Sequence, residues 1–296
     1  MLGMARGKVG DIVFSRRLGQ QVTRAYVASV NDAATRGQVE QRGKMGNLVN
    51  QYRLLRPLLI KANESKPIGN TDYNRYAHYN LGNKIVPLTK AEKDAGLVVF
   101  STARISTGVL ETLQYAGNSN QPAAAIFSNL FPEPTPTTTV GEFWTAFIAA
   151  NSQFQAGDQI LFAVTYGASA PPYTGLAPRL RYKEYTIDIT SAAVYEDEKG
   201  KTAPNIVFDA TRADVYHSFG MIPDMMPTAQ LVVQSRKDAS GKLLVSTQDL
   251  RLSNFGTMMF NEFNTDGQAA RVALSYGANE SPVLVPENLE SNFPLP

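Results

Sequence analysis

Histidine, cysteine and paired carboxylates do much of the catalytic and metal-binding chemistry of proteins, and the chain is poor in the first two. It has no cysteine and only two histidines, His78 and His217. Neither histidine has a companion at metal-ligand spacing, and an isolated histidine is more often a packed or surface residue. Without cysteine, disulfides and thiolate metal sites are excluded. We therefore expect no catalytic residue, no metal and no cofactor.

Two short motifs resemble ligand-binding loops without completing them. Gly200-Lys201-Thr202 resembles the end of a phosphate-binding loop, but Tyr195 stands where that loop needs its first glycine. Residues 262–267 resemble the first half of a calcium-binding loop, but Ala273 stands where a bidentate carboxylate is needed. A turn between strands at Asp266-Gly267 is the preferred interpretation. Facing carboxylates, as in a glycosidase, leave no sequence signature, so that class stays open.

Charge is distributed unevenly along the chain. Residues 1–61 carry 11 basic and three acidic side chains, a net charge of +8, whereas the other 235 residues carry 17 basic and 23 acidic side chains, a net charge of −6. This asymmetry favours an N-terminal arm that binds an anionic surface. The alternative is a solvated helix face rich in arginine and glutamine.

The candidate partner-binding residues are all seven cations and the only tyrosine of the first 42 residues. They are Arg6, Lys8, Arg16, Arg17, Arg24, Tyr26, Arg36 and Arg42. On nucleic acid, such residues would give salt-dependent, sequence-independent binding. Arginine and tyrosine are equally enriched in protein interfaces, so a protein with an acidic surface is the competing partner. The sequence does not separate the two.

The elements that position these residues begin with a predicted β-hairpin. Residues 12–14 and 22–27 are β-prone, and the polar stretch Ser15–Gln21 lies between them. Glycines at positions 3, 7 and 10 predict a flexible tip before the hairpin. Since an isolated hairpin is marginally stable in water, it needs a surface to lie on, either this protein's own body or a neighbour.

A helix is predicted next, over residues 33–55, with Asn31 and Asp32 as candidate N-caps and Pro57 as its end or kink. Gly43 and Gly46 weaken this helix and would permit close approach of another backbone. A second helix is predicted over residues 71–82.

From residue 97 onward, strand patterns predominate. The candidate strands are residues 98–100, 108–115, 123–127, 160–166, 182–189, 206–208, 231–234, 243–247 and 272–276. Lys237–Gly241 predicts a hairpin turn. A capping box at Thr139–Glu142 predicts one short helix whose aromatic face packs on the strands. The proline-rich segment 168–178 reads as a loop or domain boundary.

These patterns predict a mainly β protein with an α-helical N-terminal segment. Residues 1–96 form a basic hairpin and helical arm, residues 97–177 a β domain with one short helix, which the resemblance described below makes a β-sandwich, and residues 178–296 a second β-rich domain with an extended, proline-rich tail. Met1–Gly10 lacks the apolar core of a signal peptide. No apolar run approaches the roughly 20 residues of a membrane span, so we expect no membrane contact.

The N-terminal pattern resembles an uncharacterised family of Bacteroidota and their phages. It comprises Gly7-Lys-Val-Gly-Asp-Ile-Val-Phe14, then Arg16-Arg17, then Thr23-Arg24-Ala-Tyr26 and a Gln/Arg helix. Asp11 stands where asparagine is more usual. The resemblance is clear over the first 60 to 85 residues and weaker to about residue 170. It implies a hairpin, a helix and then immunoglobulin-like β-sandwich regions.

Within that group the chain is similar to head auxiliary proteins of crAss-like bacteriophages. The resemblance implies a structural virion protein that decorates and stabilises the head shell through its basic arm, and not an enzyme. Its partner would be the major capsid protein, with other head proteins possible. Many copies would sit on each particle, assembled in the bacterial host cytoplasm. The alternatives are a nucleic-acid-associated protein and a carbohydrate-binding β protein with a site at Trp144 and Tyr173.

Overall fold

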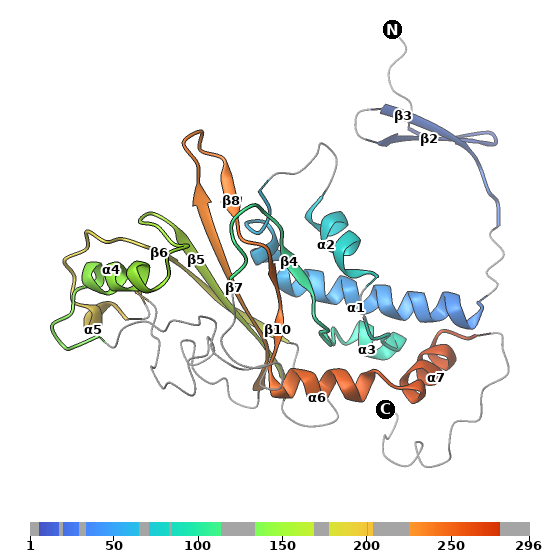
Figure 1. Cartoon of the computed structure of the whole chain (residues 1–296). Coiled ribbons are helices and arrows are strands. Elements are labelled where there is room, and N and C mark those ends of the chain that lie inside the picture. The colour runs from blue at the N-terminus through green and yellow to red at the C-terminus, as the bar shows by residue number, and fades with distance from the viewer. Residues whose placement is uncertain are drawn as a thin grey trace, which may run out of the picture.

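The computed structural model describes residues 6–17, 20–29, 34–64, 71–82, 85–113, 134–168, 178–199, 201–203 and 225–278. The elements in chain order are β1 (Gly7–Val9), β2 (Ile12–Arg17), β3 (Gln20–Ala25), α1 (Arg36–Leu59), α2 (Asp72–Asn80), α3 (Lys90–Asp94), β4 (Arg104–Ser106), α4 (Val140–Ala150), β5 (Gln159–Ala168), β6 (Arg179–Thr186), α5 (Tyr195–Glu198), β7 (Met225–Lys237), β8 (Leu243–Val245), β9 (Gln248–Asp249), β10 (Arg251–Leu252), α6 (Asn254–Phe263) and α7 (Asp266–Ser275). Figure 1 shows their arrangement.

The fold class is mixed, with helices and antiparallel sheets. Helix accounts for 36% and strand for 30% of the structure, so the mainly β class is not confirmed. The predicted strands at 123–127 and 206–208, the N-caps Asn31 and Asp32, and the tail from residue 281 lie outside the described residues.

A central antiparallel sheet organises the body. Its strand order is β10-β7-β5-β6, and β8 pairs with the end of β7. β5 lies between β6 and β7, with Ile160 opposite both Tyr185 and Gln234. One sheet therefore joins strands from both sides of residue 177, where the sequence placed a domain boundary. β6 pairs only with β5 among the described strands, so it forms an edge of this sheet.

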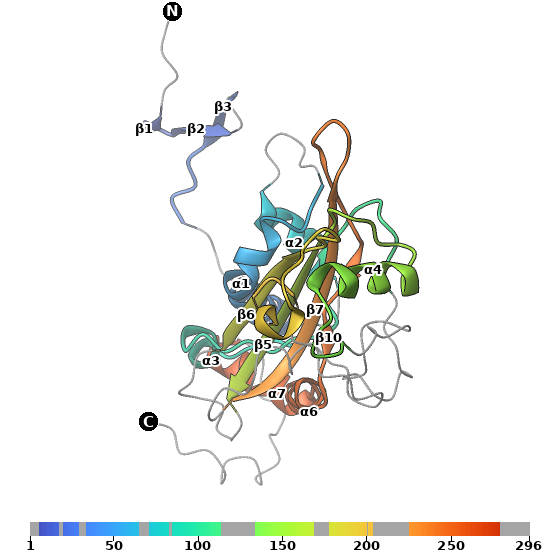
Figure 2. The ribbon, with the colours of Figure 1, turned by 90° about the vertical axis from the view of Figure 1, so that its left-hand side faces the viewer.

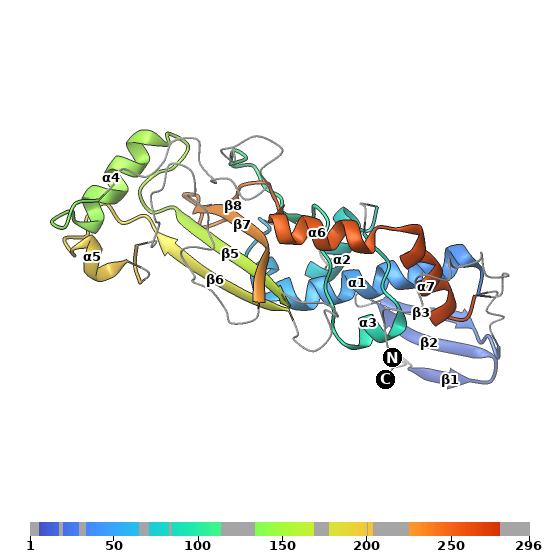
Figure 3. The same cartoon turned by 90° about the horizontal axis from the view of Figure 1, so that it is seen from below.

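Alternate residues of β5 face two different layers of helices. Ile160, Phe162 and Val164 are buried with the aromatic face of α4. Leu161 and Ala163 are buried on the opposite face with α1. This is the period-two alternation of a strand that is covered on both sides. The sheet is thus enclosed by helices (Figures 1 and 3), and an immunoglobulin-like pair of facing sheets is not confirmed.

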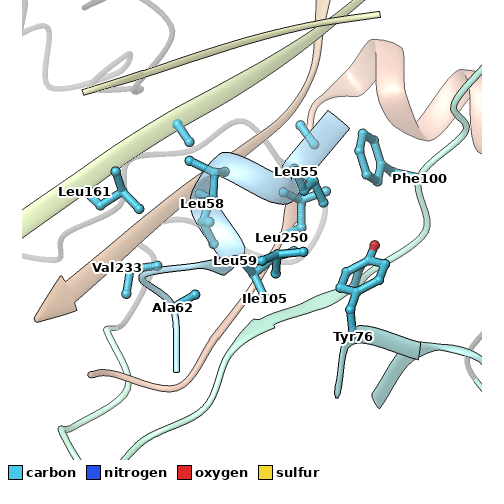
Figure 4. Packing of buried hydrophobic residues seen from close by; sticks show 14 of the residues in the cluster. Leu55, Leu58, Leu59, Ala62, Tyr76, Phe100, Ile105, Leu161, Val233 and Leu250 are labelled. Carbon is cyan, nitrogen blue, oxygen red and sulfur yellow. The ribbon is translucent and has the colours of Figure 1, made fainter. Parts of the chain in front are cut away.

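Helix α1 forms one wall of the core instead of part of a free arm. Thr35 caps it in a capping box with Gln38. Its carboxyl-terminal half buries Leu55, Leu58 and Leu59 against the sheet residues Leu161 and Val233 (Figure 4). The helix runs through Pro57 to Leu59, so the prediction that it ends at residue 55 was four residues short.

Gly43 and Gly46 let other segments approach α1 closely, as their spacing predicted. A Cβ atom on Gly43 would lie 2.9 Å from the carbonyl oxygen of Leu88 and 2.9 Å from Cγ1 of Val272. One on Gly46 would lie 3.0 Å from the side chain of Lys93. The two glycines therefore form the contact at which α3, α7 and the chain before α3 pack on α1.

Residues 98–100 were predicted to be a strand and are instead an extended segment without a ladder. Amide side chains of α1 take the place of a neighbouring strand. Asn47 Nδ2 donates to the carbonyl oxygens of Val86 and Val99 at 3.0 and 2.9 Å, and Gln51 Nε2 donates to Val99 at 2.8 Å. The buried carbonyls are thus satisfied without strand pairing.

The prediction of a last strand at residues 272–276 was wrong, because Val272 lies in α7. Thr265 caps this helix by accepting a hydrogen bond from Gln268 N at 3.1 Å. Asp266-Gly267 is accordingly the first turn of a helix and not a turn between strands. Buried Val272 packs on α1 at Gly43, and this contact fixes α7 beside α1.

Several other local predictions are confirmed. The predicted strand at 108–115 is not, because its described part makes only an isolated bridge, Leu110 to Ser246. The capping box at Thr139 and Glu142 starts α4, and Phe143, Trp144 and Phe147 are buried on the sheet. Residues 160–166 lie within β5, and Asp72–Asn80 forms the predicted second helix. The turn at Asp238–Gly241 joins β7 to β8. No helix in the described ranges is long and apolar enough to cross a membrane.

Candidate partner-binding surface

Strands β1, β2 and β3 form a small three-stranded antiparallel sheet, here called the N-terminal sheet. β2 and β3 pair over six positions, from Ile12 opposite Ala25 to Arg17 opposite Gln20. The hairpin was predicted from the sequence, but β1 was not. The sequence feature that could have predicted β1 is the two-residue turn Gly10-Asp11, in which Gly10 adopts a φ of +57°. Asp11 also accepts a hydrogen bond from Tyr26 N at 2.7 Å, which ties the loop to β3.

The strand register divides the N-terminal sheet into two faces, since side chains alternate along a strand. The apolar face comprises Val9, Ile12, Phe14, Thr23 and Ala25. The basic face comprises Lys8, Val13, Ser15, Val22 and Arg24, and Tyr26 joins it through its contact with Lys8.

Neither face is covered. Val9 is 68% exposed, Ile12 is 47% exposed and Tyr26 is 41% exposed. None of residues 6–15 and 20–29 is buried, and none belongs to a hydrophobic core cluster. Within the described residues, no hydrogen bond or ion pair joins 6–29 to the body, and Figures 1 and 2 show the sheet standing apart from it. A single-layer sheet of this size has no core of its own to stabilise it.

Lys8 and Tyr26 fix part of the basic face in place. The Lys8 ammonium lies 3.3 Å from the centroid of the Tyr26 ring. Such a cation–π contact contributes roughly 0.5–1 kcal/mol at an exposed site. It joins β1 to the end of β3 and leaves one side of the ring occupied by the cation.

The structure brings together three of the eight residues predicted to bind a partner, namely Lys8, Arg24 and Tyr26. Arg6 is exposed directly before β1. Arg16 and Arg17 end the β2 ladder opposite Gln21 and Gln20.

Arg36 and Arg42 lie elsewhere, on α1 in the body. The structure therefore does not place them with the N-terminal sheet. The exposed apolar residues Val9, Ile12 and Val22 were missed as binding candidates, because a β-prone run does not reveal from sequence which of its apolar residues stay exposed.

The structure adds no support for ligand binding by the other residues considered in the sequence analysis. His78 is exposed beside Tyr79, with ring centroids 5.5 Å apart, and His217 lies outside the described residues. Trp144 is fully buried, so its ring is not available to stack on a sugar, and Tyr173 is not described. Across the described ranges, no group of three His, Cys, Asp or Glu side chains could hold a metal ion.

Comparison of the chain with protein-family models, with curated proteins and with solved structures gives no match. The resemblance to a phage family therefore remains a prediction from the N-terminal motif, and the function is argued from the surface itself.

Proposed function

We propose that this chain is a structural protein that attaches to a larger protein assembly through its N-terminal sheet. The observation that carries the proposal is a single-layer sheet with both faces exposed, whose described residues make no hydrogen bond, ion pair or core contact with the body. Exposed apolar side chains on one face, with lysine, arginine and tyrosine on the other, are typical of an interface that a partner covers.

A protein partner fits this surface better than a nucleic acid does. A phosphate backbone would pair with Lys8 and Arg24 but would leave Val9 and Ile12 exposed to water. Stacking of a base on Tyr26 is hindered on one side of the ring, where Lys8 already lies. A protein partner with an apolar patch would cover Val9 and Ile12.

The resemblance of the N-terminal motif extends this proposal to one assembly, the head shell of a tailed bacteriophage. The partner is then the major capsid protein, and the chain is an auxiliary protein that decorates and stabilises the shell in many copies. Repeated copies on one particle would raise the overall strength of attachment through avidity. The chain would be assembled into the virion in the bacterial host cytoplasm.

The test is co-sedimentation of the purified chain with heads that lack it, and separately with duplex DNA, across a salt series. We expect binding to heads that falls at least tenfold for the variant Val9→Ser/Ile12→Ser, because this change removes the exposed apolar contacts. The matched control is Val109→Ser/Leu274→Ser, which alters similarly exposed apolar residues of the body. Tight binding to DNA with no affinity for heads would contradict the proposal.

A further inference from the structure

The end of the body formed by α4, α5 and the chain around them is acidic. Across residues 134–157, 187–199 and 201–203 the chain carries five acidic and two basic side chains, a net charge of −3. The acidic ones are Glu142, Asp188, Glu196, Asp197 and Glu198. Of these, all except Glu198 are exposed. We call this surface the acidic end.

The acidic end is a rigid surface and not a loop. Backbone hydrogen bonds join the start of α4 to the chain before α5: Val140 N donates to Ala193 O at 2.8 Å, and Tyr195 N donates to Thr138 O at 2.9 Å. The rings of Phe143 and Tyr195 pack beneath it, with centroids 4.7 Å apart. The backbone that carries the carboxylates is therefore held in place, and one of them, Glu196, is paired with Lys199.

Exposed apolar side chains accompany these carboxylates. Ile189 is 43% exposed and Val194 is 37% exposed. Ile189 follows Asp188 directly, and Val194 lies next to α5. The surface thus combines negative charge with aliphatic contact area.

The basic face of the N-terminal sheet has the complementary composition. Its cations are Lys8 and Arg24, and residues 6–29 as a whole carry five basic and one acidic side chain, a net charge of +4. Val22, at 41% exposed, lies on that face with Arg24 and Tyr26. Cations and aliphatic groups on one surface thus match carboxylates and aliphatic groups on the other, which is the kind of pairing that steers association and selects register.

The two surfaces lie at opposite ends of the molecule. Figures 1 and 3 show the N-terminal sheet at one end and α4 with α5 at the other. The body between them includes α1, whose 24 residues span roughly 36 Å. In this arrangement the two surfaces of one copy do not meet, but those of neighbouring copies can.

We propose that the basic face of the N-terminal sheet of one copy docks on the acidic end of the next copy. The inference rests on the proposed function in one respect, that the N-terminal sheet is a docking element. It adds that the apolar face meets the host assembly while the basic face meets a second copy of this chain. Because the two contacting surfaces differ, the contact is heterologous and builds rings or chains of copies.

The test uses two charge-reversal variants of the full chain. The arm variant is Lys8→Glu/Arg24→Glu, and the end variant is Glu196→Lys/Asp197→Lys. Each keeps one of the two surfaces intact. Matched controls with the same change in charge are Lys237→Glu/Lys242→Glu for the arm variant and Asp94→Lys/Glu111→Lys for the end variant. All eight positions are exposed.

Sedimentation velocity in low salt reports the outcome. We expect the wild-type chain and both controls to self-associate below about 100 μM. The arm variant and the end variant each associate at least tenfold more weakly by themselves. Mixed together they form a one-to-one complex and nothing larger, because the intact sheet of the end variant docks on the intact acidic end of the arm variant. Raising the salt to about 0.5 M weakens this complex, since screening shortens the reach of the charges.

Three results would overturn the inference: a wild-type chain that stays monomeric, an end variant that associates like wild type, or a mixture that stays monomeric. Binding to heads separates this failure from failure of the proposed function. The end variant keeps its N-terminal sheet and must still bind heads if the proposed function holds. If it binds heads but self-associates normally, only the inference fails.

Discussion

At the scale of single residues, glycine and amide residues of α1 determine how neighbouring segments pack against this helix. Gly43 and Gly46 give room for neighbouring chain, and Asn47 and Gln51 satisfy the carbonyl of Val99. Tyr76 adds to this network by donating to Gln51 Oε1 at 2.8 Å, and burial raises the pKa of its hydroxyl, which keeps that donor protonated. The helix thus contributes space and hydrogen bonds as well as leucines.

Two glycines of α1 make a matched pair for testing this view. A Cβ on Gly37 would meet nothing within 4 Å, whereas a Cβ on Gly43 would lie 2.9 Å from a backbone oxygen. We expect Gly37→Ala to stabilise the protein by up to about 1 kcal/mol through helix propensity. Gly43→Ala should destabilise it by about 1–3 kcal/mol through overpacking. Urea denaturation measures both, and equal effects of the two changes would contradict the packing role of Gly43.

The carboxyl of Glu142 gives a prediction for pH dependence. Hydrogen bonds from the backbone N–H and then the hydroxyl of Thr139 hold its pKa below the usual value. A lowered pKa in the folded state means that the bond stabilises α4 above the unfolded pKa, and that this contribution is lost as pH falls through the folded pKa.

We expect a carbon-13 NMR titration to place the Glu142 midpoint below that of an ordinary glutamate. Thr139→Ala should raise the midpoint part of the way, because the backbone N–H remains. A midpoint that is unchanged by this substitution would show that the hydroxyl makes no contribution.

At the scale of elements, local signals predicted well where the element is set by its own sequence. The hairpin, α4 with its capping box and the core of β5 were all visible in short windows. Val272 was misassigned because a short apolar run suits either a strand or a buried helix. Thr265 caps the helix that contains it. Residues 98–100 were misassigned because their partners are side chains of α1, which no local pattern reveals.

The N-terminal sheet should be dispensable for folding of the body. Deletion of residues 1–29 should leave the thermal midpoint within a few degrees of wild type, because described residues 6–29 make no hydrogen bond or core contact with the body. Near-ultraviolet circular dichroism, dominated by the buried Trp144, should keep its shape. Loss of this signal would mean that the N-terminal sheet is part of the core.

At the scale of the whole molecule, the central sheet joins distant parts of the chain. Ile160 of β5 pairs with Gln234 of β7, and both strands pack on α1 near the start of the chain. The strands could be predicted singly, but this order could not, since nothing local specifies which strands will pair. For the same reason the acidic end could not be predicted from the sequence, because its residues lie on both sides of the segment 158–186.

Cutting the chain at the predicted boundary tests the unity of the sheet. A fragment that ends at residue 177 loses both neighbours of β5, namely β6 and β7. We expect residues 1–177 and residues 178–296, expressed separately, to lack cooperative thermal unfolding in calorimetry. A cooperative transition in either fragment would show that it is an independent domain.

The edge strand β6 has a consequence for solubility. An open strand is a template on which other chains add, and proteins protect such edges with charge. β6 carries Arg179, Arg181 and Lys183 at alternate positions, so two copies that approach edge to edge would bring like charges together. A protein made in many copies at high local concentration would thereby avoid aggregating through its largest sheet, and contacts between copies would be directed to the surfaces at its two ends.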